Sequence, residues 1–282
     1  MLKPIPIFDN HVHLHPNGRH VEAVRDFARA GGTHLVLSHL PYEMVPVTEA
    51  RHFGESYQIT LNMAERCRRE TEVGVEVTLG PYPVLLIGLA ERHGLTRAVE
   101  IMKEGMEEAQ RQVLEGRAIG IGEIGRPHFP VPPDIWEASN DIIHHGMRLA
   151  KEASCPVVLH TESATPENMR EMAMLADKAG LPRHKVVKHY CPPLVREDEN
   201  SGLFPSVLAS RPAVTEALSK GTRFLMETDY LDDMQRPGAV MAITTVPKRT
   251  KALLQSGHMS QEQAAIIHGE NPRKVYGIEV RC

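Results

Sequence analysis

The sequence predicts a (β/α)8 barrel built as a single domain over residues 1–282. Eight short apolar or β-branched runs alternate with longer amphipathic stretches, over about the length that such a barrel needs. No compositional break or low-complexity segment divides the chain into separate domains. A doubly wound sheet is the alternative, but it usually places a glycine-rich phosphate loop after its first strand, where this chain has His11-Val-His-Leu-His15.

The short apolar runs predict the eight strands. Their β-branched and hydrophobic residues favour extended backbone that is buried on both faces, as in parallel sheets. Pro205 interrupts the seventh run and makes it the least regular of the eight. The predicted strands are Pro4–His11, His34–Ser38, Val73–Leu79, Ala118–Ile124, Pro156–His160, Lys185–His189, Leu203–Leu208 and Thr222–Asp229.

Between these runs, apolar residues recur at the spacing of one helix face, as Val21, Val24 and Phe27 do in the first helix. Glycine follows several of the stretches, for example at Gly31 and Gly180, which is typical of helix ends. The predicted helices are His20–Ala30, Ser56–Arg69, Thr96–Leu114, Asp134–Ala153, Pro166–Ala179, Arg211–Ser219, Gly238–Gln255 and Ser260–His268, and a short one opened by Asn271-Pro272.

The composition excludes several classes of protein. With 41% hydrophobic and 24% charged residues, the chain has enough apolar material for a large core and is not disordered or fibrous. Lysine and arginine number 32 against 36 acidic residues, a net charge of −4, so no basic excess would hold an extended nucleic-acid duplex. The four cysteines form no CxxC pair, and no signal peptide or membrane-spanning run is evident; we therefore expect a cytoplasmic protein that does not bind membranes.

Histidine is unusually frequent, with 16 in the chain, and two of them form the pair His11-x-His13. Alternation along a strand points both side chains, and that of Asp9, to the same side. About one such pair is expected by chance from this many histidines, so the spacing alone carries no weight. The position carries weight, because barrels of this kind place their active sites at the carboxyl ends of the strands.

Four further predicted strands end in a side chain that can bind a metal. These side chains are Glu123, His160, His189 and Asp229. Buried at a strand end without a partner, each would carry a desolvation cost, whereas a divalent cation would satisfy all of them together. A buried network of hydrogen bonds without a metal is the alternative.

These motifs occur in the order seen in the TatD-like metal-dependent hydrolases of the amidohydrolase superfamily, which the chain resembles from its first strand to its last helix. The motifs are the His-x-His pair, Gly-Glu123-Ile-Gly, the two strand-end histidines, Glu-Thr-Asp229 and the ending Asn271-Pro-Arg-Lys-Val-Tyr-Gly277. The resemblance implies a centre with two divalent ions per chain. It implies that His11, His13 and Asp229 hold one ion, that His160 and His189 hold the other, and that Glu123 bridges them.

The resemblance also implies the chemistry of such a centre. Imidazole and carboxylate ligands without thiolate favour Zn²⁺ or Mn²⁺, with Mg²⁺ possible. Two ions about 3.5–4 Å apart activate a shared water and polarise the bond that it attacks. Asp229 and Glu123 are then the catalytic carboxylates, with Asp229 also placed to accept a proton from that water. Asp9 is a candidate for orienting an imidazole, and an ordinary hydrogen bond in the barrel floor is the alternative.

Four positions depart from the family pattern and would line the substrate pocket. Tyr82 stands where the family has a histidine, and Arg126-Pro127 replaces Leu-Asp after the glutamate motif. Glu162 stands where arginine is common, and Tyr190 begins the segment that replaces Phe-x-Gly. Arg126 could bind a phosphate through two hydrogen bonds, whereas Glu162 would repel one. The loop Arg126-Pro-His128 follows a strand end, where substrate contacts concentrate.

We therefore expect a metal-dependent hydrolase similar to TatD-type deoxyribonucleases, with a small molecule or a nucleic-acid end as substrate and a phosphodiester as the favoured bond. Hydrolysis of a small amide, ester or lactone is the alternative, and the tyrosines around the site suit such a partly apolar substrate. A non-catalytic metal-dependent binding protein is a lesser alternative, since no ligand is missing. Lys188, adjacent to His189, is expected to point to the opposite face of its strand.

Overall fold

The computed structural model describes residues 5–236 and 239–281, and its strands form one parallel sheet. Their order is β8-β7-β6-β5-β4-β3-β2-β1-β9, so nearly every strand lies beside its neighbour in the sequence. The strands are β1 (Phe8–His13), β2 (His34–Ser38), β3 (Gly74–Leu79), β4 (Gly120–Gly125), β5 (Val157–His160), β6 (Val186–Cys191), β7 (Phe204–Leu208), β8 (Leu225–Glu227) and β9 (Tyr230–Leu231).

The eighth strand of the predicted barrel is broken into two halves. Its first half, β8, pairs with β7, and its second half, β9, pairs with β1 on the other edge of the sheet. Between the halves, Asp229 has a positive φ of 48°, which redirects the chain. Because the two halves bind both edges, the sheet closes on itself, and the predicted (β/α)8 barrel is confirmed.

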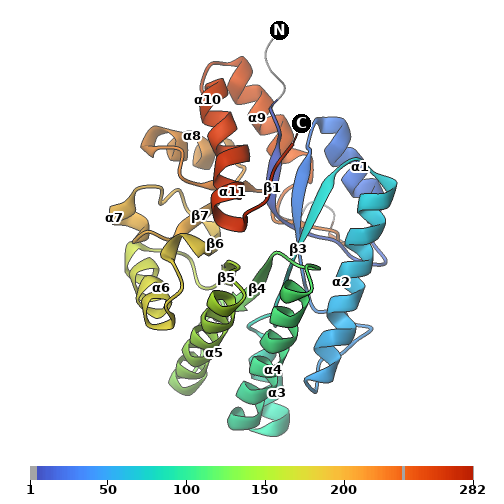
Figure 1. The fold of residues 1–282 in the computed structure, drawn as a ribbon, viewed down its shortest axis with the longest axis vertical. Coiled ribbons are helices and arrows are strands. Elements are labelled where there is room, and N and C mark those ends of the chain that lie inside the picture. The colour runs from blue at the N-terminus through green and yellow to red at the C-terminus, as the bar shows by residue number, and fades with distance from the viewer. Residues whose placement is uncertain (1–4, 237–238, 282) are drawn as a thin grey trace.

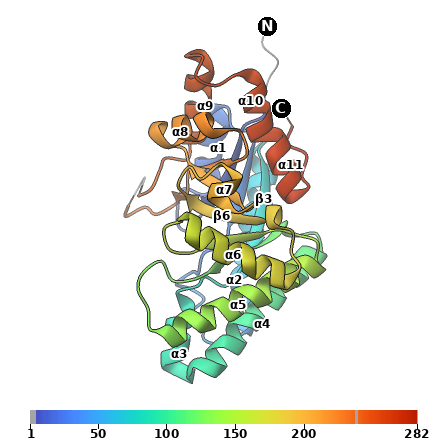
Figure 2. The same cartoon turned by 90° about the vertical axis from the view of Figure 1, so that its left-hand side faces the viewer.

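Helices surround this sheet, as Figures 1 and 2 show from two directions. The helices are α1 (Val21–Ala30), α2 (Arg51–Glu70), α3 (Leu85–His93), α4 (Leu95–Leu114), α5 (Pro133–Glu152), α6 (Pro166–Ala179), α7 (Glu197–Asn200), α8 (Arg211–Lys220), α9 (Thr245–Gln255), α10 (Gln261–Ala265) and α11 (Asn271–Tyr276). A 3-10 turn at Arg183–Lys185 and a π-helical turn at Ile266–Glu270 complete the elements.

The core has an inner and an outer part. Inside the barrel, apolar side chains from successive strands pack on one another, among them Phe8, Val158 and Phe204. Outside it, the longer helices turn an apolar face to the strands, as α1 does with Phe27, which is fully buried. Burying a side chain of this size contributes about 1.5–3 kcal/mol. Helix α11, labelled beside β1 in Figure 1, packs against that strand. The Tyr276 hydroxyl donates to Asn10 Oδ1 at 2.8 Å.

The predicted elements agree with most of this architecture. Strands β2 to β7 lie within two residues of their predicted ends, whereas β1 extends to His13 rather than stopping at His11. Pro4 and Gly238, where two predicted elements start, lie outside the described residues. Among the described residues, β1 begins at Phe8 and α9 at Thr245, so the predicted extensions over residues 5–7 and 239–244 are wrong. Helices α3 and α7 were not predicted, since the apolar residues of α3 follow one another without helical spacing. In the part of the chain that the structure describes, no helix is both long and apolar enough to cross a bilayer.

Candidate metal centre

The carboxyl ends of five strands bring the six predicted side chains together. His11 and His13 come from β1, Glu123 from β4, His160 from β5, His189 from β6, and Asp229 from the break after β8. Strands β1, β4, β5 and β6 have parallel partners on both sides, and β8 pairs in parallel with β7, so their carboxyl ends lie at the same mouth of the barrel. The six side chains form two groups, each compact enough to surround one ion.

The first group consists of His11, His13 and Asp229. The register of β1 against β2 shifts between Asp9 and Val12, the stretch that contains His11. Nε2 of His11 and Nε2 of His13 lie only 3.0 Å apart. Asp229 Oδ1 lies 3.4 Å from His13 Nε2. Two ring nitrogens and a carboxylate oxygen therefore face one point.

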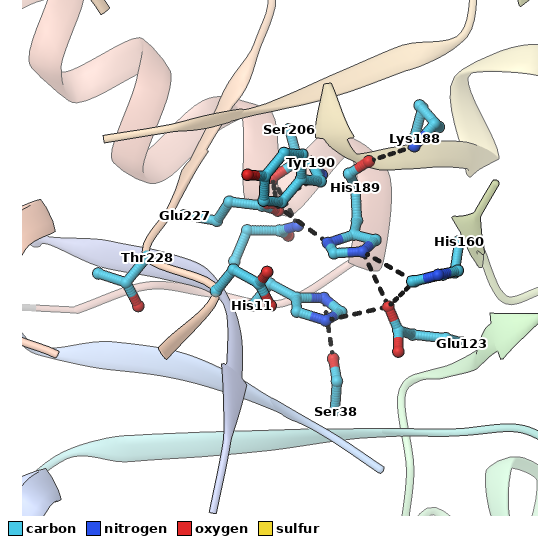
Figure 3. A network of polar contacts seen from close by, with 12 residues as sticks. His11, Ser38, Glu123, His160, Lys188, His189, Tyr190, Ser206, Glu227 and Thr228 are labelled. Atoms are coloured by element: carbon cyan, nitrogen blue, oxygen red, sulfur yellow. Dashed lines mark hydrogen bonds and ion pairs between the residues drawn. The ribbon is translucent and has the colours of Figure 1, made fainter. Parts of the chain in front are cut away.

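Glu123 lies at the centre of the second group (Figure 3). Its Oε1 is 3.2 Å from His160 Nδ1 and 2.9 Å from His189 Nε2. The same oxygen is 3.4 Å from His11 Nε2 in the first group. One carboxylate, 2% exposed, thus faces both groups at once.

Burial opposes every charge in this centre, and the neighbouring groups decide which charges persist. Burial lowers the pKa of His189, but the charges of Glu123 and Glu227 outweigh it and raise that pKa to about 10. Burial raises the pKa of Glu123, but His189 and His160 outweigh it and hold that pKa well below its usual range. Burial, together with the charge of His189, lowers the pKa of His11. A buried His189–Glu123 ion pair therefore lies beside a neutral His11.

The donor set suits a borderline divalent cation. Two imidazole nitrogens that face each other at 3.0 Å repel unless a proton or a cation lies between them. The pKa of His11 is lowered, which leaves a lone pair free for a cation. Imidazole and carboxylate ligands without thiolate are those of Zn²⁺ and Mn²⁺ sites, and the residues present fit such ions.

The ring nitrogens that point away from these groups also have partners. Ser38 Oγ lies 3.1 Å from His11 Nδ1, and the Ser38 carbonyl oxygen lies 3.0 Å from His13 Nδ1. Glu227 Oε1 lies 3.2 Å from His189 Nδ1 and accepts a bond of 2.7 Å from the Tyr190 amide (Figure 3). Partners of this kind fix the orientation of a metal-binding imidazole.

Neither Ser38 nor Glu227 was predicted as part of the site. Glu227 lies two residues before Asp229, so strand alternation was a signal that could have found it. Ser38 carried no such signal, because its place beside His11 depends on how β1 and β2 align.

Asp9 takes the alternative role that the sequence left open. Its Oδ1 accepts from the amides of His11 at 3.3 Å and Thr228 at 3.0 Å, and its Oδ2 accepts from the Thr228 hydroxyl at 2.8 Å. The expected contact with an imidazole is therefore corrected: Asp9 connects the backbone of β1 to that of the broken eighth strand. Burial raises its pKa to about 8.

A pocket of about 410 Å³ opens over the two groups, and Tyr82, Tyr190 and Glu162 line it as predicted positions. The Tyr82 ring contacts the His160 ring edge-on, with the two ring centroids 5.1 Å apart. Lys188 also lines the pocket, although it was expected on the opposite face, because its Nζ reaches back to the His189 carbonyl oxygen at 2.6 Å. A larger hollow of about 670 Å³ beside α1 and α9 contains none of the six side chains.

Arg126 lies away from the pocket surface and is 2% exposed. Its guanidinium donates to Glu162 Oε1 at 2.9 Å, Glu171 Oε2 at 3.1 Å and Asn140 Oδ1 at 2.7 Å, and it lies 3.9 Å from the centre of the Trp136 ring. Arg126 was predicted to bind a phosphate, and Glu162 was predicted to repel one. In the structure these two side chains form an ion pair with each other.

The sequence and the fold of this chain are both similar to those of known proteins. The model of the family described as "TatD related DNase" matches residues 8–277. The uncharacterized protein MJ1127 of Methanocaldococcus jannaschii is 36% identical over 99% of this chain and 99% of its own length. The crystal structure of the phosphotriesterase homology protein from Escherichia coli, complexed with phosphate in its active site, superposes with a TM-score of 0.67 at 17% identity, covering 97% of this chain and 99% of that one. YjjV, a TatD homologue from Escherichia coli, does so with a TM-score of 0.63 at 20% identity, covering 96% and 98%. At these identities the two structures speak for the fold alone.

Proposed function

The chain belongs to the TatD-related DNase family of metal-dependent hydrolases, and on that premise we propose that it hydrolyses a phosphoester with two divalent ions. The observation that carries the proposal is the placement of Glu123, whose Oε1 lies within 3.4 Å of imidazoles from both ligand groups. A carboxylate so placed suits a bridge between two ions, which is the arrangement that two-metal hydrolases use.

The proposed ligands follow the two groups. His11, His13 and Asp229 would hold one ion, and His160 and His189 the other, with Glu123 between them. Zn²⁺ or Mn²⁺ is favoured by the imidazole-rich set, and Mg²⁺ is the less favoured alternative. When bound, such ions lower the pKa of a coordinated water and polarise the phosphoryl oxygens.

The residues of this chain would supply the rest of the chemistry. The Asp229 carboxylate belongs to the first ligand group and also lines the pocket, so it is placed to accept a proton from the attacking water. Glu227 and Ser38 would keep the imidazoles in one orientation through the reaction. Tyr82 and Tyr190 would form the walls against which the leaving group rests.

A phosphodiester in a small molecule or at a nucleic-acid end is the favoured substrate. The match of residues 8–277 to the model of the family described as "TatD related DNase" supports a phosphodiester, since that is the bond a DNase cleaves. A long duplex is disfavoured, because the chain carries a net charge of −4 and Arg126 is engaged by carboxylates. The pocket of about 410 Å³ accommodates one terminal group rather than a groove-bound strand.

A carboxylic ester or lactone is the second candidate substrate. The pocket lining includes Leu40, Leu231 and Val240, which would pack on an alkyl or aryl group. These three side chains offer no donor to a phosphate.

A substrate panel separates the two candidates. We expect the protein loaded with Zn²⁺ or Mn²⁺ to hydrolyse bis-p-nitrophenyl phosphate faster than p-nitrophenyl esters or lactones, measured as kcat/KM. Asp229→Asn serves as the control for contaminating hydrolases. Faster turnover of esters or lactones would replace the phosphoester proposal with the carbonyl one, and no turnover of either class with a full metal content would refute both.

A further inference from the structure

The four imidazoles of the centre differ in what holds their outer nitrogens. For His11, His13 and His189, the partner lies on a strand of the barrel and is buried: Ser38 on β2 serves the first two, and Glu227 on β8 serves the third. The fourth imidazole, His160, is the exception. Its outer partner is His128, an exposed residue of the loop between β4 and α5.

The geometry fixes which nitrogen of His160 does what. Its Nδ1 faces the second ligand group, 3.2 Å from Glu123 Oε1 and 3.3 Å from His189 Nε2. Its Nε2 lies 3.0 Å from His128 Nδ1. If Nδ1 is free to bind a cation, the ring proton is on Nε2, and that N–H then donates to His128 Nδ1. The two rings meet at 71°, with centroids 5.1 Å apart, so His128 also limits rotation of the His160 ring.

The loop that carries His128 is firmly anchored at its first residue. The amide of Arg126 donates to the His160 carbonyl oxygen at 2.9 Å, so the loop is hydrogen-bonded to the same residue that His128 contacts. The Arg126 guanidinium is buried between Glu162, Asn140 and the Trp136 ring. His128 follows two residues later and is thereby held at the mouth of the pocket.

We propose that His128 is a positioning residue that accepts the Nε2 proton of His160 and so strengthens the binding of a divalent cation at Glu123, His160 and His189. The segment Arg126-Pro127-His128 then acts as one unit, in which the arginine anchors the loop and the histidine orients the ligand. This proposal rests on the metal centre of the proposed function, but not on which bond is cleaved.

The test compares His128→Asn with His128→Leu. Asparagine places an oxygen near the position of Nδ1 and keeps an acceptor, whereas leucine fills a similar volume without one. In calorimetric titrations of the metal-free protein with Zn²⁺, we expect His128→Leu to weaken the second binding step by about 10–100-fold, the usual effect of losing such a partner. We expect His128→Asn to recover most of that affinity and both variants to leave the first step unchanged.

His258→Ala provides the matched control, because His258 is an exposed histidine whose Nδ1 contacts only Ser256 Oγ among the described residues. Its Zn²⁺ affinities should equal those of the unmodified protein.

Two results would overturn the proposal. The first is an equal affinity for the second Zn²⁺ in the unmodified protein and in both His128 variants. The second is binding of a third Zn²⁺ that is lost in His128→Leu, since His128 would then be a ligand itself. If His128→Leu melts early, the comparison of His128→Asn with the unmodified protein decides: a loss of more than tenfold would overturn the acceptor role. None of these readouts uses a substrate, so a failure of the proposed reaction leaves them interpretable.

Discussion

Replacing Glu123 by glutamine tests the electrostatics of the centre in the metal-free protein. The amide keeps the shape of the side chain but removes the charge that faces His189 Nε2 at 2.9 Å. Glu123 is 2% and His189 4% exposed, so water screens the pair little. Removing one partner of a buried ion pair typically costs about 3–5 kcal/mol of unfolding free energy. We expect a loss near the lower end of this range, because Glu227 still faces His189 Nδ1 and the imidazole can release its proton.

The loss of unfolding free energy in Glu123→Gln should depend on pH, and the protonation of His189 determines the direction of this dependence. Its pKa is raised from 6.5 to about 10 in the folded protein, so its stabilising contribution is full below pH 6.5 and disappears as the pH rises through 10. The pKa of Glu123 is lowered, so its contribution is full above its usual pKa of 4.5 and falls in more acid solution. The stability difference between the unmodified protein and Glu123→Gln should therefore be largest between pH 4.5 and 6.5 and shrink towards pH 10.

Urea unfolding in the presence of a chelator, at pH 6, 8 and 9.5, measures this difference. Glu171→Gln is a suitable control, because that carboxylate is 56% exposed and pairs with Arg126 outside the centre. A difference for Glu123→Gln that is the same at all three pH values would refute the assignment of a buried ion pair between Glu123 and His189.

Three further predictions concern the site and its surroundings. Asp229→Asn should lower kcat by about 10²–10⁴-fold, which is the usual contribution of a general base, and should leave Zn²⁺ binding at the second group in place. A kcat within tenfold of that of the unmodified protein would contradict the role of Asp229 as a general base. Arg126→Met should lower the unfolding free energy by about 1–3 kcal/mol in urea, because Glu162 loses its cation, and an unchanged midpoint would show that the network adds nothing. Zn²⁺ binding at pH 7 should release protons, because His189, with its pKa of about 10, must lose one; binding heats that do not vary between buffers of different ionisation enthalpy would exclude this.

The sequence was sufficient to predict the barrel and the gathering of the six side chains. Strand alternation and the rule that parallel strands end at one mouth depend only on local pattern. They placed His160 at the end of its strand, and Glu123 and His189 within two residues of the ends of theirs. The division of the eighth strand was not foreseeable, since it depends on the positive φ of Asp229.

The residues that support the six side chains were harder to predict, because each depends on distance between segments far apart in the chain. Ser38 meets His11 only through the alignment of β1 with β2, and Asp9 reaches Thr228 across the closing seam of the barrel. Arg126 was predicted from its charge alone, and only the fold shows that Glu162, Glu171 and Trp136 surround it. Local pattern predicts which face a side chain lies on, whereas its partner is set by tertiary packing.

Anomalous diffraction from crystals grown with Zn²⁺, collected on both sides of the zinc absorption edge, tests the central claim most directly. We predict two peaks per chain: one among His11, His13 and Asp229, and one among His160, His189 and Glu123. A single peak would contradict the two-ion centre, and the absence of zinc from this mouth of the barrel would contradict the metal site as a whole.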